Sequence, residues 1–240
     1  GKISMQVVVI SVTPYKEKDG IVNAVSSDET ITFLVRGLFS PNSKNAALNT
    51  NLVIADIELQ EGNFKYPVLK SSNIVSSPMK VTNDYYYLGS LMVITEATKN
   101  LLQDEEKVGI YQDLIDVILT LKNTDNPWMP VLIYMAKIFK ISGYEFEVNR
   151  CVFCGSKKDI KTFSFRDGGF VCGSCLHEDT ERDFSKEQML LVREVFNSAR
   201  SDAESSHCTK ENALFLFNKF IDFISDSYGF TLKTAALLNK

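Results

Sequence analysis

Two short stretches, Cys151-Val152-Phe153-Cys154 and Cys172-Gly173-Ser174-Cys175, decide how the second half of this chain is organised. In each stretch two residues separate a pair of cysteines, so both thiolates can face one point. Gly155 and Gly173 are expected to relieve the tight turn that each pair makes. Together the four sulfurs suit one Zn²⁺ in tetrahedral geometry. Because all four ligands are thiolates, no position stays open for water or substrate, and we predict a structural zinc site.

The segment between the two pairs favours a single shared site. Residues 162–166 and 170–172 are typical of short strands, and Asp167-Gly168-Gly169 is a turn that would fold one strand back on the other. The alternatives are two disulfides or four unrelated thiols. The insertion, at about residues 148–178, is too small for a core of its own, so we expect the metal to supply its stability. Cys208 is left over and is expected to be an inert thiol.

Composition and charge place the chain among ordinary globular proteins. It has 240 residues, of which 45% are hydrophobic and 23% charged, and its net charge is −4. No apolar run approaches the ~18 residues of a membrane span, and no signal peptide is visible, so we expect a cytoplasmic protein. Residues 1–4, before Met5, are expected to be a cloning remnant. The net charge does not indicate a nucleic-acid binder, and any such surface must be a local patch.

The pattern of the first third is that of strands, and we assign residues 1–78 to one barrel domain. Residues 30–36 alternate apolar Ile31, Phe33 and Val35 with polar neighbours. Four more strand-like runs, at 5–13, 21–26, 52–59 and 66–75, surround this one, and no long helix interrupts them. Five strands in this length favour a small closed barrel of the OB type, with an SH3-like barrel as the alternative. The fold class is therefore α+β.

From Ser76-Ser77-Pro78 onward the apolar period becomes helical, and we assign residues 79–240 to a helical bundle that contains the zinc insertion. The expected helices begin after four signals, which are Asn83 or Asp84, the proline at 127, the capping box Ser185-Lys186-Glu187-Gln188, and Thr209. Glu105 and Glu106 are expected in a solvated loop. A short amphipathic tail would bury Leu232, Ala236 and Leu237.

Motifs of common enzymes are missing from the sequence. It contains no GxxxxGK[ST], GxGxxG, GxSxG or HExxH pattern. It has two histidines, His177 and His207, and we expect both to be surface residues. A zinc-dependent hydrolase or deaminase would need an open zinc shell and a nearby general base, and the predicted site has neither. We therefore predict that the protein is not an enzyme.

The order of these parts resembles the bacterial recombination mediator family RecO. Residues 15–22 resemble an early Y-x-E-x-D-x-I-V stretch of that family. Arg36-Gly37 and the following 40–44 resemble its glycine-basic-serine loop, and the cysteine pair with Gly155 matches the position of its zinc. The family usually has more Arg and Lys after the residue that corresponds to Arg36, whereas here only Lys44 follows in that loop.

The resemblance implies a role in DNA repair and recombination without catalysis. Such proteins bind single- and double-stranded DNA, anneal strands and, with RecR, load recombinase onto strands that single-strand-binding protein covers, so we expect a nucleoid-associated bacterial protein. We assign phosphate contacts to Lys16, Arg36 and Lys44, with the lysines of the zinc insertion as the next candidates. We assign the C-terminal tail of single-strand-binding protein to three further cations: Lys137, Lys140 and Arg150. The alternative is a zinc-ribbon adaptor in transcription or translation that has no single-stranded DNA activity.

Overall fold

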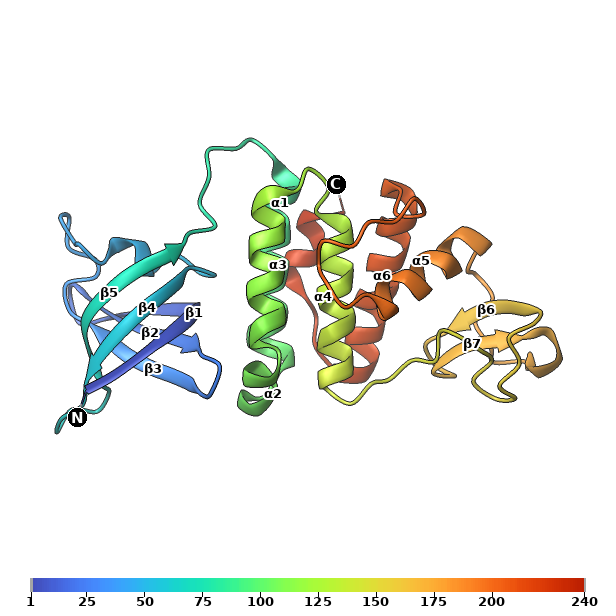
Figure 1. Ribbon diagram of the computed structural model, residues 1–240, viewed down its shortest axis with the longest axis horizontal. Helices are drawn as coiled ribbons and strands as arrows, with labels where there is room; N and C mark the ends of the chain where they lie inside the picture. Colours follow the sequence, from blue (N-terminus) through green and yellow to red (C-terminus); the bar gives the residue numbers. More distant parts are fainter. Residues whose placement is uncertain (1, 240) are drawn as a thin grey trace.

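The computed structural model describes residues 2–239. A β-barrel, a helical bundle and a small two-stranded insertion lie side by side along the long axis of the molecule (Figure 1). The barrel strands are β1 (Lys2–Tyr15), β2 (Asp19–Val25), β3 (Thr30–Val35), β4 (Ile54–Gln60) and β5 (Val68–Ser76). They form a closed barrel in the order β1-β2-β3-β5-β4. The parallel contact between Leu34 and Val68 joins β3 to β5. The predicted OB-type barrel is thereby confirmed.

Strand alternation explains the interior of the barrel. Phe33 and Val35 of β3 are fully buried and pack with residues from the other strands, Val7, Val9, Val22 and Leu59. Residues 2–4, before Met5, lie in β1, and their origin as a cloning remnant stays a prediction. Lys2 pairs with Gln60 and Ser4 with Glu58, so the sheet begins before Met5.

Six α-helices follow among the described residues: α1 (Tyr85–Leu101), α2 (Asp104–Gly109), α3 (Tyr111–Asn123), α4 (Trp128–Ile141), α5 (Lys186–Asn197) and α6 (Lys210–Tyr228). Three predicted caps are confirmed, because Asp84, Ser185 and Thr209 each accept a hydrogen bond from a backbone N–H of the first turn. Within residues 2–239 no helix is both long enough and apolar enough to cross a membrane.

Two expectations about the bundle were wrong. Glu105 and Glu106 lie in the short helix α2, where the backbone N–H of Gln103 donates to the Glu106 carboxylate over 2.8 Å. At the C-terminal end, Leu232, Ala235 and Leu238 are buried, whereas Ala236 is exposed and Leu237 only half-buried. Residues Lys233–Leu237 form a 3₁₀ turn, η3, whose period of three shifts the buried face relative to an α-helix.

Apolar packing joins the barrel to the bundle. Apolar residues on the outside of the barrel, including Val8 and Ile54, belong to the same core as the helices. The segment between β5 and α1 is held as well, because the Tyr87 hydroxyl donates to the Pro78 carbonyl over 2.5 Å. The Lys80 ammonium lies 3.9 Å from the centroid of the Tyr87 ring. The placement of a domain boundary at residue 78 stays a prediction.

The insertion is an antiparallel hairpin of β6 (Ile160–Ser164) and β7 (Gly169–Cys172), followed by the 3₁₀ turn η2 (Gly173–Cys175). Phe163 of β6 is fully buried and packs against Phe184 and Phe196, with ring centroids 5.5 and 6.1 Å apart. The insertion therefore shares the core of the bundle, and aromatic burial stabilises it in addition to any metal. The insertion was expected to lack a core of its own and to gain its stability from the metal; the contribution of the metal stays a prediction.

Candidate metal centre and nucleic-acid surface

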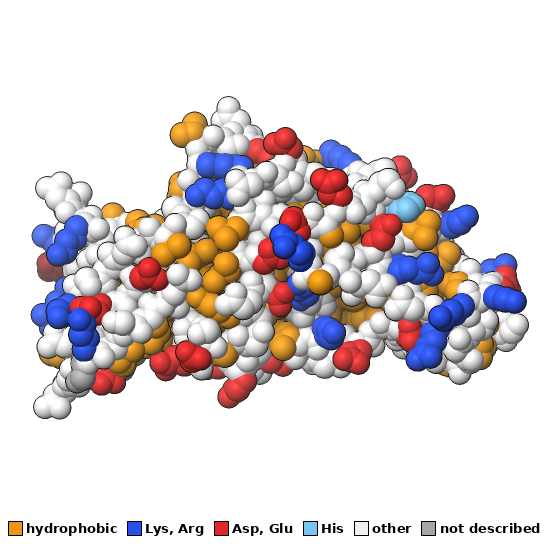
Figure 2. Space-filling model, in the orientation of Figure 1, with side chains coloured by type: hydrophobic (Ala, Val, Ile, Leu, Met, Phe, Trp, Pro, Cys, Tyr) orange, Lys and Arg blue, Asp and Glu red, His pale blue; other side chains and the backbone are white. Residues whose placement is uncertain are grey.

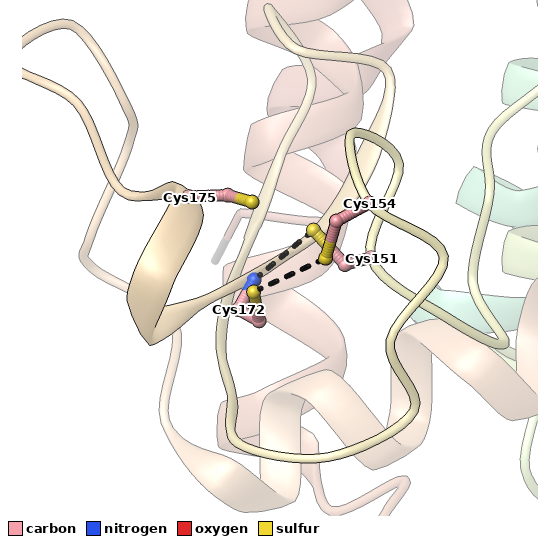
Figure 3. Close-up of side chains that lie close together, drawn as sticks. All are labelled: Cys151, Cys154, Cys172 and Cys175. Carbon is pink, nitrogen blue, oxygen red and sulfur yellow. Dashed lines mark hydrogen bonds between the residues drawn. The ribbon is translucent and has the colours of Figure 1, made fainter.

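The four predicted ligands Cys151, Cys154, Cys172 and Cys175 converge on one point (Figure 3). Their sulfur atoms all lie within 4.8 Å of one another, and the Sγ atoms of Cys154 and Cys172 are 3.6 Å apart. Sulfurs around a tetrahedral metal at about 2.3 Å would be separated by about 3.8 Å. None of the four is in a disulfide. Two loops distant in sequence thus present a donor set that fits a metal ion.

Backbone hydrogen bonds shape the first cysteine turn. The Gly155 N–H donates to the Cys151 carbonyl over 2.9 Å, and Gly155 has the positive φ of 73° that favours glycine. Gly173 was also expected to relieve a tight turn, but its φ is not positive, so it does not need the conformational freedom of glycine. A Cβ on Gly173 would lie 2.3 Å from a carboxylate oxygen of Asp159, so this glycine is needed for close approach to that side chain.

The electrostatics of the cluster favour a cation. Burial opposes ionisation of the Cys151 thiol, but backbone N–H groups, chiefly that of Cys172, outweigh it and lower the pKa to about 6. Hydrogen bonds with Cys154 and Cys172 raise the pKa of Cys175 to about 12. The Cys151 thiolate therefore forms readily and the Cys175 thiol ionises with difficulty, and thiolates at this spacing would repel one another. A metal cation among the sulfurs would remove this repulsion.

Both predicted surface histidines have acidic partners. A ring nitrogen of His177, Nε2, lies 3.0 Å from the Asp167 carboxylate. His207 is half-buried rather than exposed, and its Nδ1 lies 3.1 Å from Glu194. Cys208 is buried, and this burial raises the pKa of its thiol to about 11. The first pair lies within the insertion and the second joins α5 to the segment before α6, and neither histidine belongs to the four-cysteine cluster.

At one end of the barrel the structure brings the β1–β2 turn, the end of β3 and the β4–β5 loop together. The Phe39 N–H donates to the Lys18 carbonyl over 2.8 Å, and the Leu34 N–H donates to the Pro67 carbonyl over 2.9 Å. Two of the predicted phosphate-binding residues, Lys16 and Arg36, are exposed at this end. Strand contacts thus assemble one surface from three separate segments.

Aromatic side chains on this surface were missed by sequence reasoning. The Arg36 guanidinium lies 5.7 Å from the centroid of the Phe64 ring, and Phe64 is 52% exposed. The Lys65 ammonium lies 5.2 Å from the Tyr66 ring. Phe33, the aromatic residue of β3, is fully buried and cannot present its ring on this surface. The run Phe64-Lys65-Tyr66 in the loop after β4 was the available signal.

Lys44 stands apart from the other two predicted phosphate contacts. It is exposed in the loop between β3 and the 3₁₀ turn η1 (Ala46–Asn49). The adjacent Asn45 accepts a hydrogen bond from Ser72 of β5 over 3.2 Å, which places this part of the loop beside the middle of β5. Lys44 is therefore placed toward the middle of β5, whereas Lys16 and Arg36 lie at the end of the barrel.

The three cations assigned to a partner tail have different environments. The half-buried Lys137 ammonium contacts the Asp113 carboxylate and donates to the Ala199 carbonyl over 2.6 Å. Arg150 forms an ion pair with Glu147 over 3.0 Å. Lys140 is exposed and borders a cavity of about 750 Å³ that Lys137 also lines and Arg150 does not. Apolar side chains complete its wall: Ile110, Ile141, Phe146, Val195 and Phe196.

The architecture defines a class of protein: an OB-type barrel joined to a helical bundle that carries a four-cysteine insertion. The family described as recombination protein O, C terminal, matches residues 82–234. Two curated relatives named DNA repair protein RecO match nearly the whole chain. The Oceanobacillus iheyensis protein is 22% identical over 97% of this chain and 91% of its own length. The Bacillus subtilis protein is 21% identical over 97% and 92%.

A third relative with the same name, from Halalkalibacterium halodurans, is 26% identical over 72% of this chain and 68% of its own length. Because the family match covers more than half of the chain, the chain belongs to the RecO family.

Proposed function

We propose that the protein is a mediator of DNA repair and recombination that binds DNA and anneals complementary strands without catalysing a reaction. The observation that carries this proposal is the barrel end where Arg36, Phe64 and Lys65 are exposed together, beside the half-buried ring of Tyr66. Single-strand binders of the OB type combine cations that contact the backbone with aromatic rings that stack on bases. The names of the relatives support a role in DNA repair.

We infer that the four cysteines hold one structural Zn²⁺. Four thiolates suit this ion and leave no coordination site for a substrate. In this role zinc would fix the two cysteine turns relative to each other and take no part in chemistry. A catalytic alternative would need an open coordination position beside an acid or base, and the four sulfurs already fill a tetrahedral shell.

We further propose that the protein acts with RecR, at the bacterial nucleoid in the cytoplasm, on strands coated by single-strand-binding protein. The acidic, apolar C-terminal tail of that protein would occupy the cavity beside Lys140. Ile141 is 39% exposed next to this lysine, so an apolar side chain and a carboxylate of the tail can be bound side by side. Because Lys137 and Arg150 already have acidic partners, Lys140 is the principal cation of this proposal.

A salt series tests the proposed DNA surface. Each phosphate contact to a single strand contributes about 0.7 to the slope of log affinity against log salt, so two or three contacts give a slope near 2. Anisotropy of a labelled oligonucleotide should show that the barrel contributes a slope of this size, with weak binding at physiological salt. The variant Arg36→Ala with Lys44→Ala should bind more weakly. A slope of five or more, or unchanged binding by the variant, would place the main DNA surface elsewhere.

A further inference from the structure

The loop that carries the first cysteine pair also carries a local excess of positive charge. Residues 150–161 contain four basic residues and one acidic residue, although the chain as a whole has a net charge of −4. Lys and Arg side chains gather over the insertion at the end of the molecule opposite the barrel (Figures 1 and 2). This charge is not explained by the proposed binding of DNA to the barrel.

Phe153, between the first two cysteines, is 54% exposed, whereas Phe163 and Phe170 of the same insertion are buried. Large aromatic rings are usually buried, so an exposed one on a fixed backbone is informative. The backbone here is fixed, because the Val152 N–H donates to the Phe170 carbonyl over 2.8 Å. The cysteine turn itself therefore presents the ring to solvent.

One neighbouring ring supports Phe153. The ring of His177 packs against it at a centroid distance of 5.7 Å and an interplanar angle of 78°. The hydrogen-bonding distance of 3.0 Å between His177 and Asp167 fixes the imidazole in turn. No other aromatic ring contacts Phe153 in the described part of the chain. His177 thus holds the Phe153 ring from one side, and the exposed part of the ring remains accessible for stacking.

Two lysines follow Phe153 in the same loop. The Cys151 N–H donates to the Ser156 carbonyl over 2.7 Å, which closes the turn just before Lys157 and Lys158. Both lysines are exposed, and within residues 2–239 neither ammonium has an ion-pair or hydrogen-bond partner. Lys161 differs, since it pairs with Asp159 over 2.6 Å. The loop therefore offers two uncompensated cations beside an oriented ring.

We propose that this loop binds single-stranded nucleic acid, with Phe153 stacked on a base and Lys157 and Lys158 on phosphates. Stacking on an exposed ring requires an unpaired base, so a single strand fits and a duplex does not. The site is separate from the barrel and gives each chain a second contact with a strand. The competing explanation is that the lysines only offset the negative charge of the metal–thiolate cluster, which would leave binding unaffected by their removal.

The test uses the full-length, zinc-loaded protein with labelled oligo(dT) and oligo(rU) in anisotropy titrations. Phe153→Leu should weaken binding at least about fivefold, the loss expected for one stacked base. Lys157→Gln with Lys158→Gln should lower the salt slope by about 1.4. The matched control is Lys99→Gln with Lys233→Gln, which removes the same charge from exposed positions on the bundle and should leave the slope unchanged. Zinc content and circular dichroism establish that each variant is folded.

The outcomes separate this site from the barrel. When Phe153→Leu is added to the variant Arg36→Ala with Lys44→Ala, the residual affinity should fall further. In a separate variant, Phe153→Trp, the fluorescence of the new indole should be quenched by either oligonucleotide. Equal binding by the loop variants and the parent, or an equal change in slope for the control pair, would overturn the proposal while the barrel site stands. Loss of all binding in the barrel variant alone would overturn it as well.

Discussion

Arg36 at the end of β3 lies over the ring of Phe64 in the β4–β5 loop, with its guanidinium carbon 5.7 Å from the ring centroid. A cation–π contact at an exposed site stabilises by about 0.5–1 kcal/mol, so the pair is enough to orient both side chains but leaves them available to a ligand. The contact joins two segments that are far apart in the sequence. It therefore marks the part of the barrel surface where phosphate and base recognition can coincide.

Replacing Phe64 by leucine should weaken single-stranded DNA binding at least about fivefold, because the loop loses its stacking ring and Arg36 loses its support. Anisotropy at low salt measures the change. Tyr85→Leu serves as the matched control, since Tyr85 is a similarly exposed aromatic residue on α1. If Phe64→Leu and Tyr85→Leu bind equally well, the β4–β5 loop is not part of the DNA surface.

Purified, reduced protein should contain one tightly bound zinc per chain. Cys154→Ser should lose it, because one hard oxygen replaces a thiolate and the turn loses its anchor. Cys208→Ala removes the cysteine outside the cluster and should retain the metal. Elemental analysis of the three proteins decides the point, and a zinc-free parent or a zinc-free Cys208→Ala would contradict the assignment.

The buried Phe163 should matter for the stability of the whole bundle and not of the insertion alone. Phe163→Ala should lower the free energy of unfolding by about 3–5 kcal/mol, because it opens a cavity among the rings of Phe184 and Phe196. Phe153→Ala, at an exposed position of the same insertion, should cost less than about 0.5 kcal/mol. Urea unfolding followed by circular dichroism gives both values. Similar losses for the two variants would mean that the insertion does not share the bundle core.

Charge reversal at Lys140 should impair binding of the acidic tail. A hydrogen bond to a charged group contributes about 1.5–3 kcal/mol, so Lys140→Glu should weaken the affinity for a tail peptide at least about tenfold. Lys99→Glu makes the same change at an exposed position of α1 and should bind normally. In calorimetry, absence of heat for the parent at high micromolar peptide would reject the site.

Local signals predicted much of the fold. Asp84, Ser185 and Thr209 begin helices because their side chains satisfy free N–H groups of the first turn, a rule that depends only on neighbouring residues. The spacing of the two cysteine pairs likewise predicted a shared metal site, and all four sulfur atoms converge on one point. Period-two alternation in β3 correctly placed Phe33 and Val35 inside the barrel.

Long-range relationships were not predictable in this way. Arg36 meets Phe64 only because β3 and β5 are adjacent when the barrel closes. Lys137 has Asp113 as its partner because α3 packs on α4, and the spacing along one helix did not reveal it. The C-terminal residues followed a period of three rather than that of an α-helix, so the choice of Ala236 and Leu237 was wrong.

Strand annealing tests the central proposal most directly. Two complementary labelled oligonucleotides, mixed at low salt with the full-length zinc-loaded protein and no nucleotide, should form duplex faster than without protein. Arg36→Ala with Lys44→Ala should reduce this acceleration. Duplex formation at the spontaneous rate in the presence of folded, zinc-containing protein would contradict the account and favour an adaptor without single-stranded DNA activity.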